Sequence, residues 1–169
     1  MGRDRPGIVA AITAGLLRVD GNVEDSRMTN LGGYFAVMLI VSIPDEQNLE
    51  RVEAALAFSC EGLGLDALSV NEIAPATVAS AASHTITVYG SDHPGIVHAI
   101  TAELASLGVN VTDLQTRLTG APEAPLYVMM LEIECGENAS ITDVEAQLGA
   151  VAERTSVEVS IAPIEVEAL

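Results

Sequence analysis

The stretch Asp4-Arg5-Pro6-Gly7-Ile8-Val9-Ala10-Ala11-Ile12-Thr13 decides the fold, because it occurs twice in the chain. Its second copy, Asp92-His93-Pro94-Gly95-Ile96-Val97-His98-Ala99-Ile100-Thr101, follows 88 residues later. When this offset is kept as far as Asp25 and Asp113, 13 of the 22 aligned positions are identical. Identity over such a length indicates a duplicated domain. We therefore divide the 169 residues into two domains of about 80 residues each.

Each copy predicts a turn that leads into a helix. The proline has a fixed φ that suits a first helical turn, and the aspartate two positions earlier lies near the positive end of the helix dipole. After the glycine, apolar residues recur at helical spacing. They are Ile8, Val9, Ile12, Leu16 and Val19 in the first copy, and Ile96, Val97, Ile100, Leu104 and Leu107 in the second. We predict helices over residues 6–20 and 94–107.

The remaining pattern predicts strands and a second helix in each half. The first half continues with strands at 22–29 and 34–43, a helix with the apolar face Leu49, Val52, Leu56 and Leu63, and a strand at 65–73. The second half has strands at 84–89, 110–119, 126–134 and 157–161, and a further helix at 141–154. Residues 75–83 are rich in Ala and Ser and read as a linker. The fold class is α+β, with domain 1 (residues 1–74) reading αββαβ and domain 2 (residues 84–165) reading βαββαβ.

Composition and charge argue against several classes of function. The chain has 7 basic and 24 acidic residues and a formal net charge of −17, so we expect no direct contact with nucleic acid or with a membrane surface. The longest apolar run, residues 34–41, is too short to span a membrane, and no signal pattern opens the chain, which predicts a cytoplasmic protein. Cys60 and Cys135 have no CxxC spacing, so we expect reduced thiols rather than a metal or redox pair.

The order βαββαβ, with Asp-x-Pro-Gly-Ile-Val opening the first helix and Gly-x-Asn-Val or its like opening the second strand, resembles the ACT domain. Two such domains in one short chain, with the run from Asn22 to Gly32, look most similar to the glycine cleavage system transcriptional repressor family. The resemblance implies two ferredoxin-like domains that bind an amino acid for regulation. It also implies that ACT domains pair side by side, with the ligand where the first loop of one domain meets the second strand of its neighbour. Some amino-acid-binding members carry Asn at the positions of Asp4 and Asp92, and His at those of Gly2 and Gly90.

The motif positions of this family map onto both halves of the chain. The candidate ligand-binding residues are Asp4, Gly7, Ile8, Asn22 and Val23 in domain 1, and Asp92, Gly95, Ile96, Asn110 and Val111 in domain 2. Their chemistry suits an amino acid, because a helix N-terminus can bind the α-carboxylate, an aspartate can accept from the α-ammonium, and an asparagine offers both a donor and an acceptor. Structural roles stay open beside this one. The aspartates could cap the helices, the glycines could allow tight helix–strand packing, and the asparagines could fix a turn.

The first half lacks the strand that opens the second half. Met1-Gly2-Arg3 aligns with Tyr89-Gly90-Ser91, where that strand ends. In the ferredoxin-like order this strand is central, so its absence leaves two rows of backbone groups without partners. One hypothesis, which we rank first, is that the natural chain begins upstream and Met1 is internal. The others are that the remaining strands close up to make three, or that a neighbouring chain lends a strand such as the alternating tail 164–169.

The sequence shows no nucleophile–base arrangement and no metal-ligand spacing, so we expect neither an enzyme nor a bound metal or cofactor. His93 and His98 lie five residues apart, not four, and are expected to be surface residues. We interpret the chain as a regulatory protein that senses a small amino acid such as glycine and forms a homodimer. By family analogy, it would act on transcription through a protein partner. The alternative is a dimerisation or interaction module without a ligand.

Overall fold

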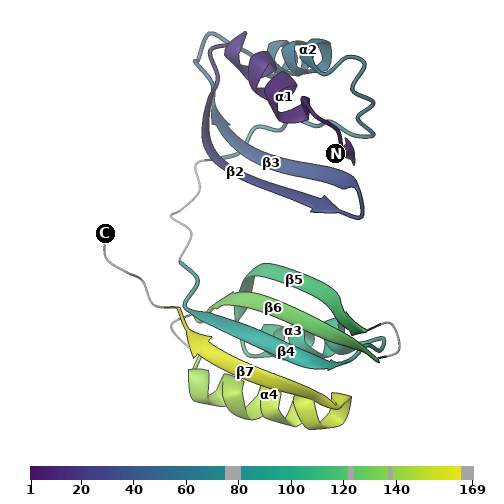
Figure 1. The fold of residues 1–169 in the computed structure, drawn as a ribbon. Helices are drawn as coiled ribbons and strands as arrows, with labels where there is room; N and C mark the ends of the chain where they lie inside the picture. Colours follow the sequence, from purple (N-terminus) through teal and green to yellow (C-terminus); the bar gives the residue numbers. More distant parts are fainter. Residues whose placement is uncertain (75–80, 122–123, 137–138, 165–169) are drawn as a thin grey trace. The chain divides into compact units, whose positions relative to one another are not determined.

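The computed structural model describes residues 1–74, 81–121, 124–136 and 139–164. The chain forms two compact units, Met1–Ala76 and Thr77–Leu169, each with its own sheet, helices and apolar core (Figure 1). The linker expected at 75–83 lies mostly outside the described residues, and so does the tail at 164–169 apart from its first residue. Each unit is α+β, as the duplicated motif predicts.

The first unit contains β1 (Gly2–Arg3), α1 (Ile8–Leu17), β2 (Asn22–Leu31), β3 (Tyr34–Ser42) and α2 (Leu49–Ser59). Its sheet is antiparallel in the order β1-β3-β2, and both helices lie on one face of it (Figure 1). The helices bury their apolar stripes against that face. The buried core consists of Ile8, Ile12, Leu16, Val19, Phe35, Val52, Leu56 and Cys60.

The leading strand of the first unit has two residues, Gly2 and Arg3, which pair with the first two residues of β3. The strand predicted at 65–73 does not form. Leu65 makes an isolated bridge to Gly2, and the described residues after it are irregular. In this fold the fourth strand needs the leading strand as its ladder partner, and two residues provide almost no ladder. The hypothesis that the remaining strands close up to make three is wrong in its pairing. The described sheet has three strands, but β3 pairs with β1 and β2 and not with residues 65–73.

The second unit is a complete βαββαβ fold. It contains β4 (His84–Ser91), α3 (Ile96–Ser106), β5 (Asn110–Ala121), β6 (Ala124–Glu134), α4 (Ile141–Thr155) and β7 (Val157–Pro163). The antiparallel sheet has the order β5-β6-β4-β7, with the leading strand β4 in the centre, as predicted. Both helices pack on the face that includes Ile86 and Val88, where the buried residues form one core.

The second hairpin is four residues longer than the first. Asn22 of β2 pairs with Ser42 of β3, and Asn110 of β5 pairs with Glu134 of β6. The matching residues of β2 and β5 are therefore 88 positions apart in the sequence, whereas those of β3 and β6 are 92 positions apart. The described ladder of β5 and β6 continues past Thr119 and Leu126 to Ala121 and Ala124. This difference changes what surrounds the two aspartates of the repeated motif.

Candidate functional site

Both predicted binding loops lead into a helix through a left-handed glycine. Gly7 has φ 97° and ψ −10°, and Gly95 has φ 100° and ψ −10°. The helices begin at Ile8 and Ile96, so the prolines lie before them and not in their first turn. A Cβ at either glycine would meet nothing within 4 Å, so tight helix–strand packing does not explain these glycines. The positive φ explains them, because glycine adopts it without steric cost.

Within the described residues, no side chain caps either helix. The role of Asp4 and Asp92 as helix caps, which the sequence left open, is therefore wrong. The first N–H groups of each helix keep their hydrogen-bonding capacity, and the helix dipole favours an anion at this end. Ile8 and Ile96 are each only 2% exposed, so their side chains belong to the cores. A ligand would reach only their backbone.

Asp4 is held by the hairpin of its own unit. Nδ2 of Asn30 donates a hydrogen bond of 2.6 Å to Oδ2 of Asp4. The backbone N–H of Asp4 donates to the carbonyl oxygen of Gly33 at 2.9 Å, and Oδ1 of Asn30 accepts from the N–H of Gly33 at 3.2 Å. The sequence pattern did not predict a site role for Asn30, because its only signal was its position at the predicted turn.

Asp92 lies in a different environment. It is exposed, and within the described part of the chain its carboxylate accepts no hydrogen bond. Its charge acts on two neighbours. Burial, assisted by the charge of Asp92, raises the pKa of Tyr127. The carbonyl groups of Thr155 and Pro94 raise the pKa of His93, and the charge of Asp92 adds to this effect. Both motif aspartates are exposed, but in the described chain only the carboxylate of Asp4 accepts a hydrogen bond from a neighbouring side chain.

The other half of the predicted site is the start of the second strand in each unit. Asn22 and Asn110 are exposed and begin β2 and β5. Val23 is 38% exposed, and Val111 is half-buried. The strand register shifts immediately after each valine, which is a β-bulge in the same place in both units. Bulges bend a strand and redirect its side chains, and they are common beside functional sites.

The structure does not bring the two halves of the site together within one unit. Ser91, which precedes the loop, pairs with Leu126 of β6, and Leu126 pairs on its other side with Thr119 of β5. Asn110 lies at the opposite end of β5 from Thr119. A strand rises about 3.3 Å per residue, so these ends are roughly 30 Å apart. Arg3 and Asn22 lie at opposite ends of the first sheet in the same way. A single small ligand therefore cannot contact both halves within one unit.

Gly2 and Gly90 occupy the positions where the resembling family can carry histidine, and both are closely packed. A Cβ at Gly2 would lie 3.1 Å from Cα of Leu65, and a Cβ at Gly90 would lie 2.7 Å from Cγ1 of Val157 and 3.3 Å from the carbonyl oxygen of Ser156. The backbone after the second helix occupies the space that a larger side chain would need. These two positions therefore serve packing.

His93 has a larger role than its spacing predicts. Its ring lies between two carbonyl oxygens, with Nε2 2.8 Å from that of Thr155 and Nδ1 3.1 Å from that of Pro94. The histidine thus connects the loop before α3 to the end of α4. The repeat offers one clue, because the aligned residue, Arg5, also contacts a backbone carbonyl.

Other kinds of site receive no support from the described residues. Among them, no group of three or more His, Cys, Asp or Glu side chains could hold a metal ion. Nor is any helix of this part of the chain long and apolar enough to cross a membrane. The hollow between α4 and β7, and the one beside Met130 and Glu132, contain none of the predicted binding residues.

Family models match both units of the chain. One model described as an ACT domain matches residues 1–68, and another matches residues 84–150. Together they cover both Asp-x-Pro-Gly loops and both strand starts. The matches therefore agree with the duplication read from the sequence.

Two proteins with similar sequences are a transcriptional repressor, which matches most of the chain, and a protein without an assigned function, which matches less than half of it. The glycine cleavage system transcriptional repressor of Escherichia coli K12 is 26% identical over 140 residues, which is 83% of this chain and 73% of that protein. A UPF0237 protein of Methanopyrus kandleri is 33% identical over 73 residues, which is 43% of this chain and 81% of that protein.

Two solved structures resemble the whole chain. A protein of unknown function from Galdieria sulphuraria has a TM-score of 0.77 and 31% identity, and the match covers 97% of this chain and 94% of that one. A structure described as a glycine cleavage system transcriptional repressor has a TM-score of 0.71 and 18% identity, covering 98% and 94%. At that identity, the second likeness bears on the fold alone.

Proposed function

Because this chain belongs to the ACT domain family, we propose that it is a non-enzymatic regulatory protein that binds a small amino acid, such as glycine. A relative that spans most of the chain is a glycine cleavage system transcriptional repressor, which supports a regulatory role. The ligand would bind where the loop of one ACT domain meets the strand start of another.

The observation that carries this proposal is the form of the loop before α3. It combines an exposed carboxylate, Asp92, with a helix start that no described side chain caps and a glycine with open space around it. An α-carboxylate can accept from the first N–H groups of the helix, and an α-ammonium can donate to Asp92. Both ends of a zwitterion therefore find complementary groups within one short loop.

The separation of the two half-sites supports binding between domains of different copies of the chain. Asn110 offers an amide donor and acceptor but lies at the far end of the sheet from Asp92. In the dimer that we propose, two copies lie side by side about a two-fold axis with their strands antiparallel, so that the loop of each copy lies beside the strand start of the other. We propose a homodimer with composite sites.

The acidic charge of the chain supports an indirect action on transcription. A net charge of −17 repels the phosphate backbone of DNA. The regulated step would therefore depend on a protein partner whose surface complements this charge. Amino-acid binding would change the affinity for that partner by favouring one assembled state.

A thermal-shift screen of the common amino acids with the full chain tests this proposal. A ligand that binds only the native state adds about 2.7 kcal/mol at one hundred times its Kd. We expect a small amino acid to raise the Tm. The substitution Asp92→Asn should make the binding free energy of that amino acid less favourable by about 1.5–3 kcal/mol. Asp45→Asn, at an exposed residue outside the loops, is the matched control. The absence of any shift across the screen would refute amino-acid binding.

One observation favours the second candidate, an interaction module without a ligand. The face of the first sheet that points away from the helices exposes large apolar side chains, including Leu31 at 70%, Tyr34 at 48% and Met38 at 70%. Exposed apolar groups that gather on one element commonly mark protein interfaces. A dimer that forms as the protein concentration rises, and that no amino acid stabilises, would support an interaction module without a ligand.

A further inference from the structure

The residue after the motif aspartate makes a similar contact in both units, to a backbone carbonyl at or near the end of the second helix. In the first unit, Nη1 of Arg5 donates to the carbonyl oxygen of Gly62 at 3.4 Å. In the second, Nε2 of His93 lies 2.8 Å from the carbonyl oxygen of Thr155. Both acceptors lie just after or at the end of the second helix of their unit. Each side chain therefore ties the loop before the first helix to the end of the second helix.

The two acceptor corners are built alike. Gly64, with φ 63°, and Ser156, with φ 51°, both turn the chain through the left-handed region. The residue after each of them pairs with the second-last residue of the leading strand, since Leu65 pairs with Gly2 and Val157 pairs with Gly90. The same corner thus faces the same loop in both repeats, although the side chain that bridges them has changed from arginine to histidine.

The two bridges differ in how they depend on protonation. Arginine keeps its charge at every pH at which proteins are stable. The ring of His93 has a carbonyl oxygen at each nitrogen, at 2.8 Å from Nε2 and 3.1 Å from Nδ1. A neutral imidazole has one N–H and can donate to only one of them, whereas the imidazolium donates to both.

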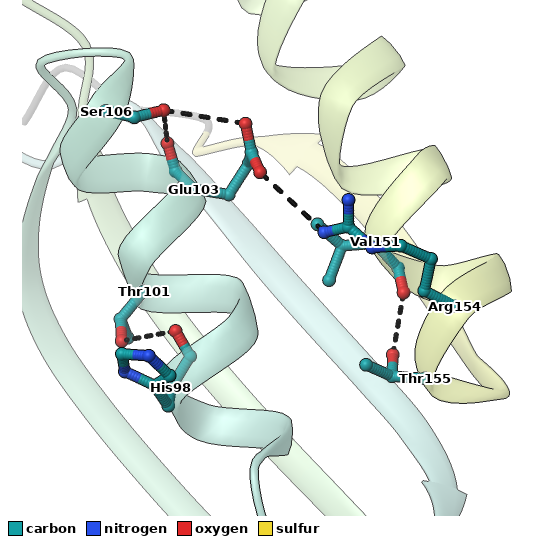
Figure 2. A network of polar contacts seen from close by, with 7 residues as sticks. All are labelled: His98, Thr101, Glu103, Ser106, Val151, Arg154 and Thr155. Atoms are coloured by element: carbon teal, nitrogen blue, oxygen red, sulfur yellow. Dashed lines mark hydrogen bonds and ion pairs between the residues drawn. The ribbon is translucent and has the colours of Figure 1, made fainter.

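The charged groups near His93 come from its own loop and from the end of α4. On its own loop, the neighbour is the Asp92 carboxylate, which stabilises the positive ring and also acts on Tyr127 of β6. On α4, Glu153 and Arg154 precede Thr155. Arg154 pairs with Glu103 of α3 at 3.9 Å (Figure 2).

The acceptor on α4 is held in place by its own helix. The hydroxyl of Thr155 donates to the carbonyl oxygen of Val151 at 2.8 Å (Figure 2). The side chain of this residue is therefore occupied, while its backbone carbonyl is the group that faces His93. The Arg154–Glu103 pair connects the same end of α4 to α3. The corner is thus a fixed point against which the loop can be positioned.

We infer that Arg5 and His93 are positioning residues for the two Asp-x-Pro-Gly loops, and that the tether of the second unit loosens as pH rises while that of the first does not. The carbonyls of Thr155 and Pro94 raise the pKa of His93 above its ordinary 6.5, which agrees with this geometry. The stabilisation is fully present below the unfolded pKa and is lost as pH rises through the higher folded pKa.

This inference goes beyond the proposed function and does not require a ligand. The tether can be measured in the free full-length chain by hydrogen exchange of residues 91–97 and by NMR titration of the histidine rings. We expect His93 to titrate above its ordinary pKa. We expect protection of residues 91–97, corrected for intrinsic exchange, to fall about fivefold between about pH 6 and about pH 8.5, the effect of one lost hydrogen bond.

Reciprocal variants separate positioning from general stability. In His93→Arg, the hydrogen-exchange protection of residues 91–97 should stay high and should no longer depend on pH. In Arg5→His, the protection of residues 3–9 should become dependent on pH. His98→Arg, at an exposed histidine of α3, is the control and should change neither. The inference is overturned if His93 titrates at or below its ordinary pKa, or if the pH response of residues 91–97 survives in His93→Arg. If His93→Arg does not fold, the response of Arg5→His decides.

Discussion

The side-chain amide of Asn30 donates a hydrogen bond of 2.6 Å to the carboxylate of Asp4, which lies 26 residues earlier in the chain. The β2–β3 turn is thereby fastened to the loop before α1. In the second unit the position aligned with Asn30 is Leu118, which has no side-chain amide. The strands of the longer hairpin stay paired beyond this position, as far as Ala121 and Ala124. The two motif loops are therefore alike in backbone but differ in what holds their aspartates.

Replacing Asn30 with Leu, the residue of the second repeat, should destabilise the first unit. The variant loses the bond to Asp4 and the bond from Gly33, but both groups are exposed and regain water, so we expect a loss of about 1 kcal/mol. Urea unfolding followed by NMR signals of the first core would measure it. Asn71→Leu, at an exposed irregular residue, is the control. Equal stability of the two variants would contradict a structural role for this contact.

Two glycine-to-alanine changes should have opposite effects in the second unit. Gly95 has φ 100°, where a Cβ is strained, so Gly95→Ala should cost about 1–2 kcal/mol. Gly149 lies within α4, and a Cβ there would meet nothing within 4 Å, so Gly149→Ala should stabilise by about 0.5–1 kcal/mol. Thermal unfolding of both variants would compare them. A neutral Gly95→Ala would show that the left-handed turn is not retained in solution.

The two cysteines should differ in reactivity. Cys60 is 8% exposed, and burial raises the pKa of its thiol, so little thiolate is available near neutral pH. Cys135 is half-buried. Alkylation of the native chain followed by mass spectrometry should modify Cys135 first, and Cys60 should react quickly only after urea is added. Equal native rates would mean that the first unit opens readily.

Mixed dimers test whether the half-sites come from different copies. Asp92→Asn and Asn110→Ala should each remove amino-acid binding in the second unit. When the two variants exchange subunits at equal concentration, each mixed dimer regains one wild-type pairing of loop and strand. Binding should then return at about a quarter of the wild-type stoichiometry.

The control for this experiment is a mixture of Asp92→Asn with the double variant Asp92→Asn/Asn110→Ala, which cannot form an intact pairing. Calorimetry of both mixtures would give the stoichiometries. Binding by either single variant alone at wild-type affinity would place the site elsewhere. Failure of the first mixture to bind, in spite of confirmed exchange, would contradict the composite geometry.

The repeat itself was sufficient to predict the architecture of the second unit. Alternating strand residues such as Ile86 and Val88, and the helical spacing of Ile96 and Ile100, place apolar groups on one face of each element, and the structure buries all four. The duplication then fixed the order of elements in the second unit. These features depend on local chain geometry, which a sequence expresses directly.

Long-range contacts decided the rest. Alternation at 65–73 predicted a strand, but a strand exists only with a hydrogen-bonded partner, and β1 offers two residues. Asp4 was expected near the dipole of its helix, with capping left open beside ligand binding. In the structure a left-handed Gly7 precedes that helix, and the aspartate accepts a hydrogen bond from Asn30.

The candidate site shows the same division between sequence and structure. The motif identified Asp92 and Asn110, and the residues of both loops could be named from sequence alone. Only the strand register shows that these two lie at opposite ends of one sheet. The contact of His93 with Thr155 is likewise a tertiary feature, because 62 residues separate them and the fold alone brings the loop to the end of α4. Local periodicity determined the elements, whereas their packing determined which side chains meet.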